Sequence, residues 1–291
     1  MDRAAELDVI RKAYAQHVLG AAVVEDERLA VAFAAIHRED FLGSPPWPIV
    51  RWFRAGDYVS SPDDDPVHLY ADVLVGIVPE RRLNNGQPSL HALLMHHAAP
   101  AAGDHIVHVG TGSGYYTAIF AHLAGAKGRV TGIEYDADVA ARATANLAPY
   151  TNVRVIQGDG TQVAFGKADV IYVNAGCTRP AETWLDGLAD GGRLILPLTS
   201  GENFGANTLA NVERSGAVFR IVRRGDDFFA NRISAVAIFP CAGNRDEASE
   251  KALAAAFAGD GLQRVTRLYR HDDIADERCW VRGPGWCLAY D

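Results

Sequence analysis

The segment at residues 106–115, Ile-Val-His-Val-Gly-Thr-Gly-Ser-Gly-Tyr, constrains the fold of this chain more than any other. An apolar strand runs directly into three glycines at alternate positions, Gly110, Gly112 and Gly114, and a helical pattern follows. Glycine adopts backbone angles that are closed to other residues, and its missing side chain lets a ligand lie against the main chain. A strand, a tight glycine turn and a helix N-terminus together predict a nucleotide-binding corner.

The spacing of the glycines discriminates between nucleotides. A dinucleotide-binding turn has the pattern G-x-G-x-x-G, which would place its third glycine at Tyr115 instead of Gly114. No Gly-Lys-Ser or Gly-Lys-Thr follows, so the segment is not a P-loop. The next expected strand ends at Glu134, 20 residues after Gly114, where a carboxylate can accept both hydroxyls of a ribose. The turn and this acid favour S-adenosylmethionine, which has a ribose and no phosphate. A glycine turn without a ligand is the alternative interpretation.

Apolar strands alternate with helical segments through the middle of the chain. Strands are expected before Gly110, at 129–134, 152–156 and 168–173, and after the turn at 191–192, with helices near 113–124, 136–148 and 180–189. Strands this apolar are buried on both faces, as in a parallel sheet covered by helices. The pattern predicts an α/β fold with a Rossmann-like, seven-stranded doubly wound sheet. A helical N-terminal cover would precede it and a C-terminal extension would follow.

The cofactor is expected to contact the glycine turn and the polar residues that follow the next strands. An acid after the third strand, Asp159, can meet the amino group of adenine, and Asn174 ends the fourth strand. Structural alternatives are open: Glu134 or Thr111 could cap a helix, and Asp159 could be a turn residue. The full set of expected cofactor-binding residues is Gly110, Thr111, Gly112, Ser113, Gly114, Tyr115, Glu134, Asp159, Gly160 and Asn174.

Composition excludes several other classes of function. The net charge of −8 disfavours a general nucleic-acid binder, which needs a basic surface. No apolar run approaches the ~20 residues of a membrane helix, and the first residues show no secretory pattern. The four cysteines are scattered, without a C-x-x-C pair, so reduced thiols in the cytoplasm and no metal site are expected.

These landmarks resemble those of the protein-L-isoaspartate O-methyltransferase family, a branch of the class I S-adenosylmethionine-dependent methyltransferases. The resemblance runs from about residue 36 to residue 240. The segment at 109–115 matches the cofactor loop of the family, and Gly158-Asp159-Gly160 matches as well. Weaker similarities lie further toward the N-terminus, at 36–41 (Val-Pro-Arg-Glu-Asp-Phe in the family), 70–72 (Tyr-x-Asp) and 87–92 (Gln/Ala-Pro-His-Met-His-Ala).

One departure from the family pattern concerns the methyl acceptor. The family has Thr-Ile-Ser before the Gln/Ala-Pro pair, and that serine lies beside the accepting carboxylate; here the stretch reads Asn84-Asn85-Gly86. The resemblance implies that this segment faces the methyl donor. The expected substrate-binding residues are therefore Asn84, Asn85, Gln87, Ser89 and His91. The altered serine position and the roughly 50 residues after Pro240 suggest a divergent member.

The resemblance implies methylation of a carboxylate, which has a reference pKa near ~4 and is already ionised at neutral pH. No general base is required, so no catalytic residue is expected. Two alternatives remain open. One is a small-molecule O- or N-methyltransferase, for which His91 or His37 would be the nearest base. The other is a homologue that binds the cofactor without catalysing transfer.

Three segments are expected along the chain. Residues 1–100 would form the helical cover and the substrate-facing segment, 101–240 the cofactor-binding core, and 241–291 the extension. The partner would be a protein, a peptide or a peptide-derived substrate that carries a carboxylate.

Overall fold

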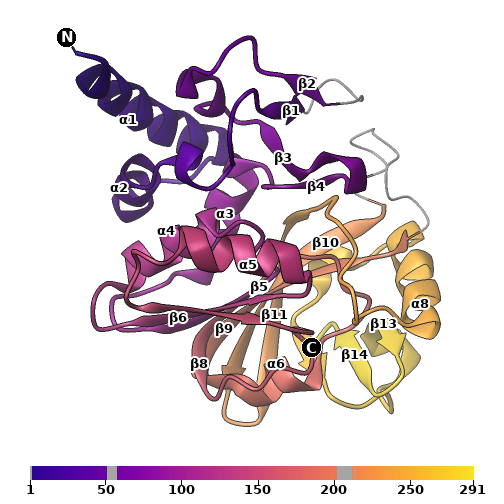
Figure 1. Cartoon of the computed structure of the whole chain (residues 1–291). Helices are drawn as coiled ribbons and strands as arrows, with labels where there is room; N and C mark the ends of the chain where they lie inside the picture. Colours follow the sequence, from indigo (N-terminus) through magenta and orange to yellow (C-terminus); the bar gives the residue numbers. More distant parts are fainter. Residues whose placement is uncertain (1, 51–57, 202–211, 213) are drawn as a thin grey trace. The chain divides into compact units, whose positions relative to one another are not determined.

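The computed structural model describes residues 2–50, 58–201, 212 and 214–291, and it consists of two compact units (Figure 1). Unit 1 comprises Met1–Gly103 and Thr111–Gln157. Unit 2 comprises Asp104–Gly110 and Gly158–Asp291. The glycine turn that follows the first expected strand therefore contributes residues to both units.

Unit 1 begins with two packed helices, α1 (Arg3–Ala22) and α2 (Glu27–Ala35), which lie side by side in Figure 1. Asp2 and Asp26 cap them by accepting N–H groups of the first turn, as short acidic side chains do at helix N-termini. The apolar stripe of α2 is buried, and Phe33 is fully inaccessible. These contacts make the N-terminal cover part of the core of unit 1.

A small antiparallel sheet follows in unit 1, with the strand order β2-β1-β3-β4. It packs around a buried cluster that includes Trp47, Leu69 and Val75. Its last strand leads directly into helix α3 (Pro88–Ala98), so the sheet positions the segment expected to face the acceptor. The strands are β1 (Pro48–Val50), β2 (Val59–Ser60), β3 (Leu74–Val78) and β4 (Leu83–Asn84), and the 3-10 turns are η1 (Arg38–Asp40), η2 (Pro66–Leu69) and η3 (Pro79–Arg81).

The remainder of unit 1 has the expected alternation of helix and parallel strand. It consists of α4 (Tyr115–Ala124), β6 (Arg129–Glu134), α5 (Ala137–Asn146) and β7 (Val153–Gln157). Strands β6 and β7 pair in parallel, with Glu134 opposite Gln157 at their carboxyl ends. Asp136 caps α5 by accepting the N–H groups of Asp138 and Val139. Glu134 is therefore not the side chain that caps this helix.

Unit 2 is built on one mixed sheet with the order β13-β14-β12-β11-β10-β9-β8-β5. The pairs β5–β8 and β8–β9 are parallel, and the strands from β9 onward pair antiparallel. The residues of β5 and β8 are almost all buried on both faces of the sheet, as their apolar sequences predict. The bounds are β5 (His105–Val109), β8 (Ala168–Val173), α6 (Glu182–Gly187), β9 (Leu188–Thr199), β10 (Gly216–Arg224) and β11 (Asp227–Ala235).

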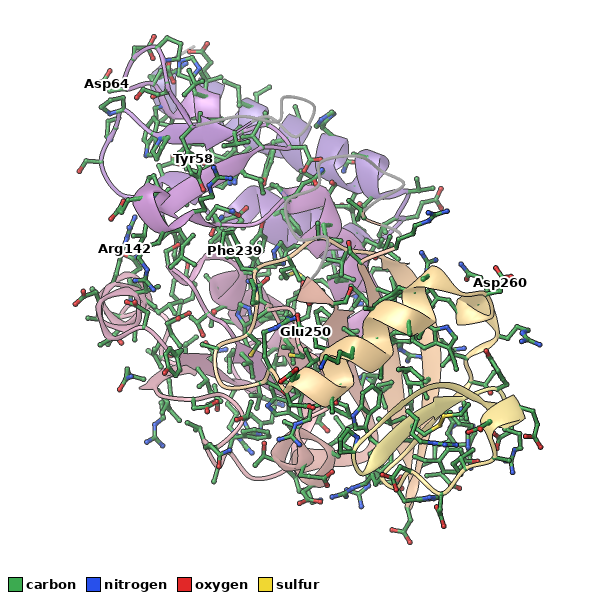
Figure 2. The ribbon with its side chains drawn as sticks, turned by 90° about the vertical axis from the view of Figure 1, so that its right-hand side faces the viewer. Tyr58, Asp64, Arg142, Phe239, Glu250 and Asp260 are labelled. Carbon is green, nitrogen blue, oxygen red and sulfur yellow. A yellow bond between two sulfur atoms is a disulfide. The ribbon has the colours of Figure 1, made fainter. Side chains whose placement is uncertain are left out.

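The C-terminal extension continues this sheet. Its strand β12 pairs with β11 and with β14, and β14 pairs with β13, so the sheet has more strands than the seven expected. Figure 2 shows helix α8 with Glu250 labelled. This helix places Phe257 against Trp280, with 5.3 Å between the ring centres. The elements are α8 (Glu247–Ala258), η5 (Leu262–Arg264), β12 (Arg267–Tyr269), η6 (Asp276–Arg278), β13 (Cys279–Gly283) and β14 (Trp286–Ala289).

The cysteines differ in part from expectation. Cys177 and Cys241 are buried and remain thiols, as predicted, but Cys279 and Cys287 form a disulfide between β13 and β14. The expectation of reduced cysteines is wrong for this pair, because antiparallel pairing brings together two residues that are far from a C-x-x-C spacing. The cytoplasmic location stays a prediction. Among the described helices, none is long and apolar enough to cross a bilayer.

Candidate functional site

The glycine turn has the backbone that its sequence predicts. Gly110, Gly112 and Gly114 all have positive φ, at 79°, 57° and 101°. Gly114 precedes α4, and a Cβ there would lie 2.9 Å from Cδ1 of Leu147, so only glycine lets the turn pass this close. At Gly112 the nearest atom to such a Cβ is Cδ1 of Ile77, at 3.4 Å, and the requirement for glycine comes from the backbone angle.

Glu134 lies against this turn within unit 1. Its carboxylate accepts the N–H of Gly112 at 2.8 Å and the N–H of Asp136 at 3.1 Å. Burial raises the pKa of Glu134 above its ordinary value, and these main-chain N–H groups act in the opposite direction because they stabilise the charged form. The result is a carboxylate held at the end of a strand, beside the glycine turn.

The hydroxyl residues of the turn do not cap the following helix. Gly114 is the N-cap of α4 and no side chain accepts there. The hydroxyl of Thr111 donates instead to the carbonyl of Ile133 at 3.3 Å, which ties the turn to β6. The hydroxyl of Ser113 is buried and has no hydrogen-bond partner, so the turn contains an unsatisfied polar group.

Tyr115 differs from the rest of the predicted cofactor set. Its ring is fully buried in an aromatic cluster of unit 1, with its centre 5.8 Å from that of Phe41 and 6.5 Å from that of Phe33. The guanidinium of Arg38 lies 5.7 Å from the same ring centre. The side chain of Tyr115 therefore holds α4 to the N-terminal cover, and only its main chain belongs to the turn.

Unit 2 contains the other predicted cofactor residues. Asp159 accepts both the N–H and the hydroxyl of Thr161 on Oδ1, each at 2.8 Å. A Cβ on Gly160 would lie 2.4 Å from Cγ1 of Val109, so this glycine is required for the close approach of the chain to β5. The amide of Asn174 donates to the carbonyl of Gly110 at 3.2 Å. Asn174 therefore satisfies the backbone of the turn.

The predicted cofactor residues thus divide into two groups. Unit 1 brings together the second part of the turn and Glu134, and unit 2 brings together the end of β5, Asp159 and Asn174. Among the described residues, no cluster of three or more His, Cys, Asp or Glu side chains is arranged to hold a metal ion.

The predicted acceptor segment at 84–91 lies between β4 and the first turns of α3. The side chain of Asn84 accepts the N–H of Gly86 at 2.8 Å and so shapes the turn. Asn85 is only 5% exposed, and its main-chain N–H donates to the carbonyl of Val75 at 2.8 Å. Its side-chain Nδ2 is buried without a hydrogen-bond partner. Asn85 therefore presents an unsatisfied donor in this segment.

Asp72 organises the start of α3, a role that the sequence did not reveal. Its carboxylate accepts the N–H and the hydroxyl of Ser89, at 2.8 and 2.6 Å, and the amide of Gln87 at 2.8 Å. The N-cap residue of α3 is Gln87, and Asp72 accepts the N–H of Ser89 in the first turn. The only sequence signal was the Tyr-x-Asp similarity at 70–72, because the two partners are 17 residues apart.

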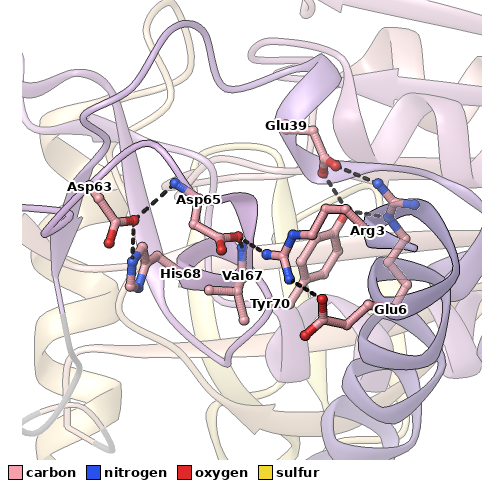
Figure 3. A network of polar contacts seen from close by, with 9 residues as sticks. Arg3, Glu6, Glu39, Asp63, Asp65, Val67, His68 and Tyr70 are labelled. Carbon is pink, nitrogen blue, oxygen red and sulfur yellow. Dashed lines mark hydrogen bonds and ion pairs between the residues drawn. The ribbon is translucent and has the colours of Figure 1, made fainter. Parts of the chain in front are cut away.

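The chain that leads to Asp72 is held by buried and ion-paired arginines. The buried guanidinium of Arg38 donates to the carbonyls of Leu69, Ala71 and Val73. Figure 3 shows the neighbouring surface network, in which Arg3 pairs with Glu6 and Asp65, and Tyr70 donates to Glu39. The segment that presents Asp72 is therefore anchored from both α1 and η1.

His91 packs tightly beside Gly86. Its imidazole stacks on Tyr116 with 3.6 Å between the ring centres and 17° between the planes. A Cβ on Gly86 would lie only 2.3 Å from Nε2 of His91, and Gly86 has a φ of 72°. The hydroxyl of Tyr116 donates to the carbonyl of Gly86 at 3.3 Å. In this conformation the imidazole occupies the space that a serine side chain at position 86 would need.

Comparison with known proteins supports the interpretation of the fold. The sequence model of the family described as Protein-L-isoaspartate(D-aspartate) O-methyltransferase (PCMT) matches residues 11–224. A protein-L-isoaspartate O-methyltransferase of Methanoregula boonei is 32% identical over 68% of this chain and 80% of the relative. That of Thermotoga maritima is 31% identical over 59% of this chain, which spans half of the relative's length.

Solved structures agree with this match. A protein-L-isoaspartate O-methyltransferase superposes with a TM-score of 0.64 at 25% identity, over 80% of this chain and 66% of that chain. A putative enzyme of this name from Plasmodium falciparum, in complex with S-adenosyl-L-homocysteine, gives a TM-score of 0.61 at 18% identity, over 80% and 99% of the two chains. The predicted Rossmann-like methyltransferase fold is confirmed. Since the family model covers well over half of the 291 residues, the chain belongs to the protein-L-isoaspartate O-methyltransferase family.

Proposed function

We propose that this protein transfers the methyl group of S-adenosylmethionine to a side-chain carboxylate of an (iso)aspartyl residue in a protein or peptide. The observation that carries the proposal is the glycine turn, whose backbone places the N–H of Gly112 on the carboxylate of Glu134. Membership of the family supplies the class of reaction. Within this scheme residues 1–100 supply the acceptor side, 101–240 the cofactor side, and 241–291 the extension.

The residues of the turn suit an adenosyl cofactor. Glu134 is an acceptor at a strand end, as binding of two ribose hydroxyls requires. In unit 2, Asp159 would accept from the adenine amino group, with Gly160 and Asn174 keeping the backbone around it in place. When bound, the cofactor supplies an electrophilic methyl group on a sulfonium.

The acceptor segment suits a carboxylate. A carboxylate is ionised at neutral pH, so this chain has to orient it and exclude water, and no side chain has to remove a proton. The buried, unpartnered Nδ2 of Asn85 is a neutral donor for one carboxylate oxygen. Orientation of this kind is worth up to ~7–11 kcal/mol of the barrier. Gln87 and Ser89 act through Asp72, which holds the helix start in place.

Two measurements test the proposal. Calorimetry should show binding of S-adenosylhomocysteine, and radiolabelled S-adenosylmethionine should transfer base-labile label to an isoaspartyl peptide, because methyl esters hydrolyse in base.

Asn85→Ala should raise the KM for the peptide about tenfold, the loss expected for a buried hydrogen bond to a charged group, and leave cofactor affinity unchanged. Asn152→Ala, which removes bonds to the carbonyls of Ala121 on α4 and of Gly125 at its C-cap, is the control.

The outcomes separate the alternatives. Base-stable label on a hydroxyl or amine acceptor would replace the proposal with a different methyltransferase activity. Binding of S-adenosylhomocysteine without transfer to any peptide or small molecule would identify a silent homologue. An absence of binding would contradict both the cofactor and the reaction.

A further inference from the structure

The segment at 241–246 joins β11 to α8 and lies beyond the family match, which ends at residue 224. It runs along the loop that follows β8 in unit 2. The N–H of Cys241 donates to the carbonyl of Gly176 at 2.8 Å, and the carbonyl of Asn244 accepts the N–H of Thr178 at 3.2 Å. The side chain of Asn244 donates to the carbonyl of Arg179 at 3.0 Å. The extension is therefore hydrogen-bonded to the loop after Asn174.

Arg245 anchors the same segment through its side chain. It donates to the carbonyl of Gly176 and to the hydroxyl of Thr199, both at 3.2 Å, and pairs with Glu250 on α8 at 2.7 Å. Phe239 and Glu250, which flank the segment in sequence, are labelled in Figure 2. Asn244 is only 3% exposed. These main-chain and side-chain bonds fix the position of the segment against the loop after β8 and against β9.

Gly243 brings this wall against Asp159. A Cβ on Gly243 would lie 2.4 Å from Oδ2 of Asp159 and 2.8 Å from its Cγ and Oδ1. No real side chain tolerates such a separation, so the main chain of Gly243 packs directly on the carboxylate. A second contact comes from Thr161, whose N–H and hydroxyl both donate to Oδ1. The Asp159 carboxylate is thus in contact with a glycine of the extension and with its own turn.

We propose that the extension forms one wall of the adenine end of the cofactor site, with Gly243 setting the position of the Asp159 carboxylate. The inference rests on the proposed function, because it takes Asp159 as the acceptor for the adenine amino group. Hydrogen bonds weaken steeply when donor and acceptor lose alignment. A side chain at position 243 has to displace the carboxylate, and the bond to adenine is then lost.

The test is the affinity of the full chain for S-adenosylhomocysteine, measured by calorimetry. Gly243→Ala should weaken binding roughly 10- to 100-fold, the range for one hydrogen bond to a charged group. Gly285→Ala is the matched control: Gly285 also lies in the extension with positive φ, 76° against 84° for Gly243, but a Cβ there meets no atom within 4 Å. Affinity should be unchanged in this control, and thermal melting compares the folded state of the two variants.

A cofactor analogue makes the test specific for adenine. S-inosylhomocysteine carries a carbonyl in place of the adenine amino group, so its affinity should not fall in Gly243→Ala. Should that variant fail to fold, Asn244→Ala loosens the segment without backbone strain, and its affinity for S-adenosylhomocysteine should fall several-fold. Unchanged affinity in a folded Gly243→Ala, or an equal loss in Gly285→Ala, overturns the inference alone. A wild-type chain that binds no S-adenosylhomocysteine overturns the proposed function as well.

Discussion

Different chemical groups fix the conformation of the glycine turn and of the predicted acceptor segment at 84–91, both in unit 1. In the turn, main-chain groups do the positioning, since the N–H groups of Gly112 and Asp136 hold the carboxylate of Glu134. In the acceptor segment, side chains do it, since the carboxylate of Asp72 binds Gln87 and Ser89 from a distant part of the chain. Backbone geometry tolerates few substitutions, whereas a side-chain network can be rebuilt. The turn accordingly keeps the family pattern, and the acceptor segment departs from it at Gly86.

The largest expected effect is at the turn. Gly112→Val should weaken binding of S-adenosylhomocysteine more than ~100-fold, because a β-branched residue at a φ of 57° distorts the backbone that contacts Glu134. Calorimetry measures the loss. Gly103→Val is the control, since Gly103 also has positive φ but a Cβ there meets nothing within 4 Å. Equal losses in both variants would show that the turn has no special role.

The acceptor segment should respond to Gly86→Ser, which introduces the residue of the family. A Cβ at this position collides with His91, so we expect the imidazole to leave its stack on Tyr116 and methylation of an isoaspartyl peptide to fall about tenfold. Cofactor affinity should not change. Steady-state kinetics measures the first effect and calorimetry the second. Faster methylation in this variant would mean that the segment adapts freely to the family residue.

Acidification should affect the turn selectively. Burial raises the pKa of Glu134, so as the pH falls this carboxylate becomes protonated at a higher pH than an ordinary glutamate does. In the proposed site the ionised form would accept the ribose hydroxyls, so affinity for S-adenosylhomocysteine should be full above that pKa and fall by up to about tenfold per pH unit below it. Binding titrations between neutral and acidic pH measure this slope. Glu134→Gln should bind more weakly and lose the slope; a slope retained in this variant would assign the titration to another group.

The smallest expected effect is on stability. Asp72→Asn removes the charge that accepts three hydrogen bonds at the start of α3, at an expected cost of about 1–2 kcal/mol in the free energy of unfolding. Denaturant unfolding measures it. Asp136→Asn, at the cap of α5, is the comparison, with less than about 1 kcal/mol expected because asparagine is also a good N-cap. If the Asp136 variant lost more stability, the side-chain network would not be the stronger of the two anchors.

The sequence predicts those parts of the structure that depend on residues close together in the chain. The strand, the glycines and the helix at 106–124 form one continuous pattern, and Glu134 ends the next strand, so the fold and the turn followed from spacing. The functions of the individual residues stay predictions. The network of Asp72 could not be predicted, because hydrogen bonding between residues 72, 87 and 89 depends on how β3 and β4 fold back. The aromatic contacts of Tyr115 and the Cys279–Cys287 disulfide could not be predicted either, because they also depend on how the chain folds back.

The C-terminal extension covers the edge of β11, and this affects how readily the sheet could pair with other molecules. Strand β11 spans nine residues, Asp227–Ala235, and β12 pairs with it at Phe228 and Phe229. A chain cut before β12 would leave this long strand as a free edge, and such edges recruit strands of other molecules. In the intact chain the outermost strand is β13, which is shorter, has an irregular register next to Cys279 and carries Arg282. Short, irregular and charged edges resist such pairing, so β13 is a less favourable edge for pairing with other copies than an uncovered β11 would be.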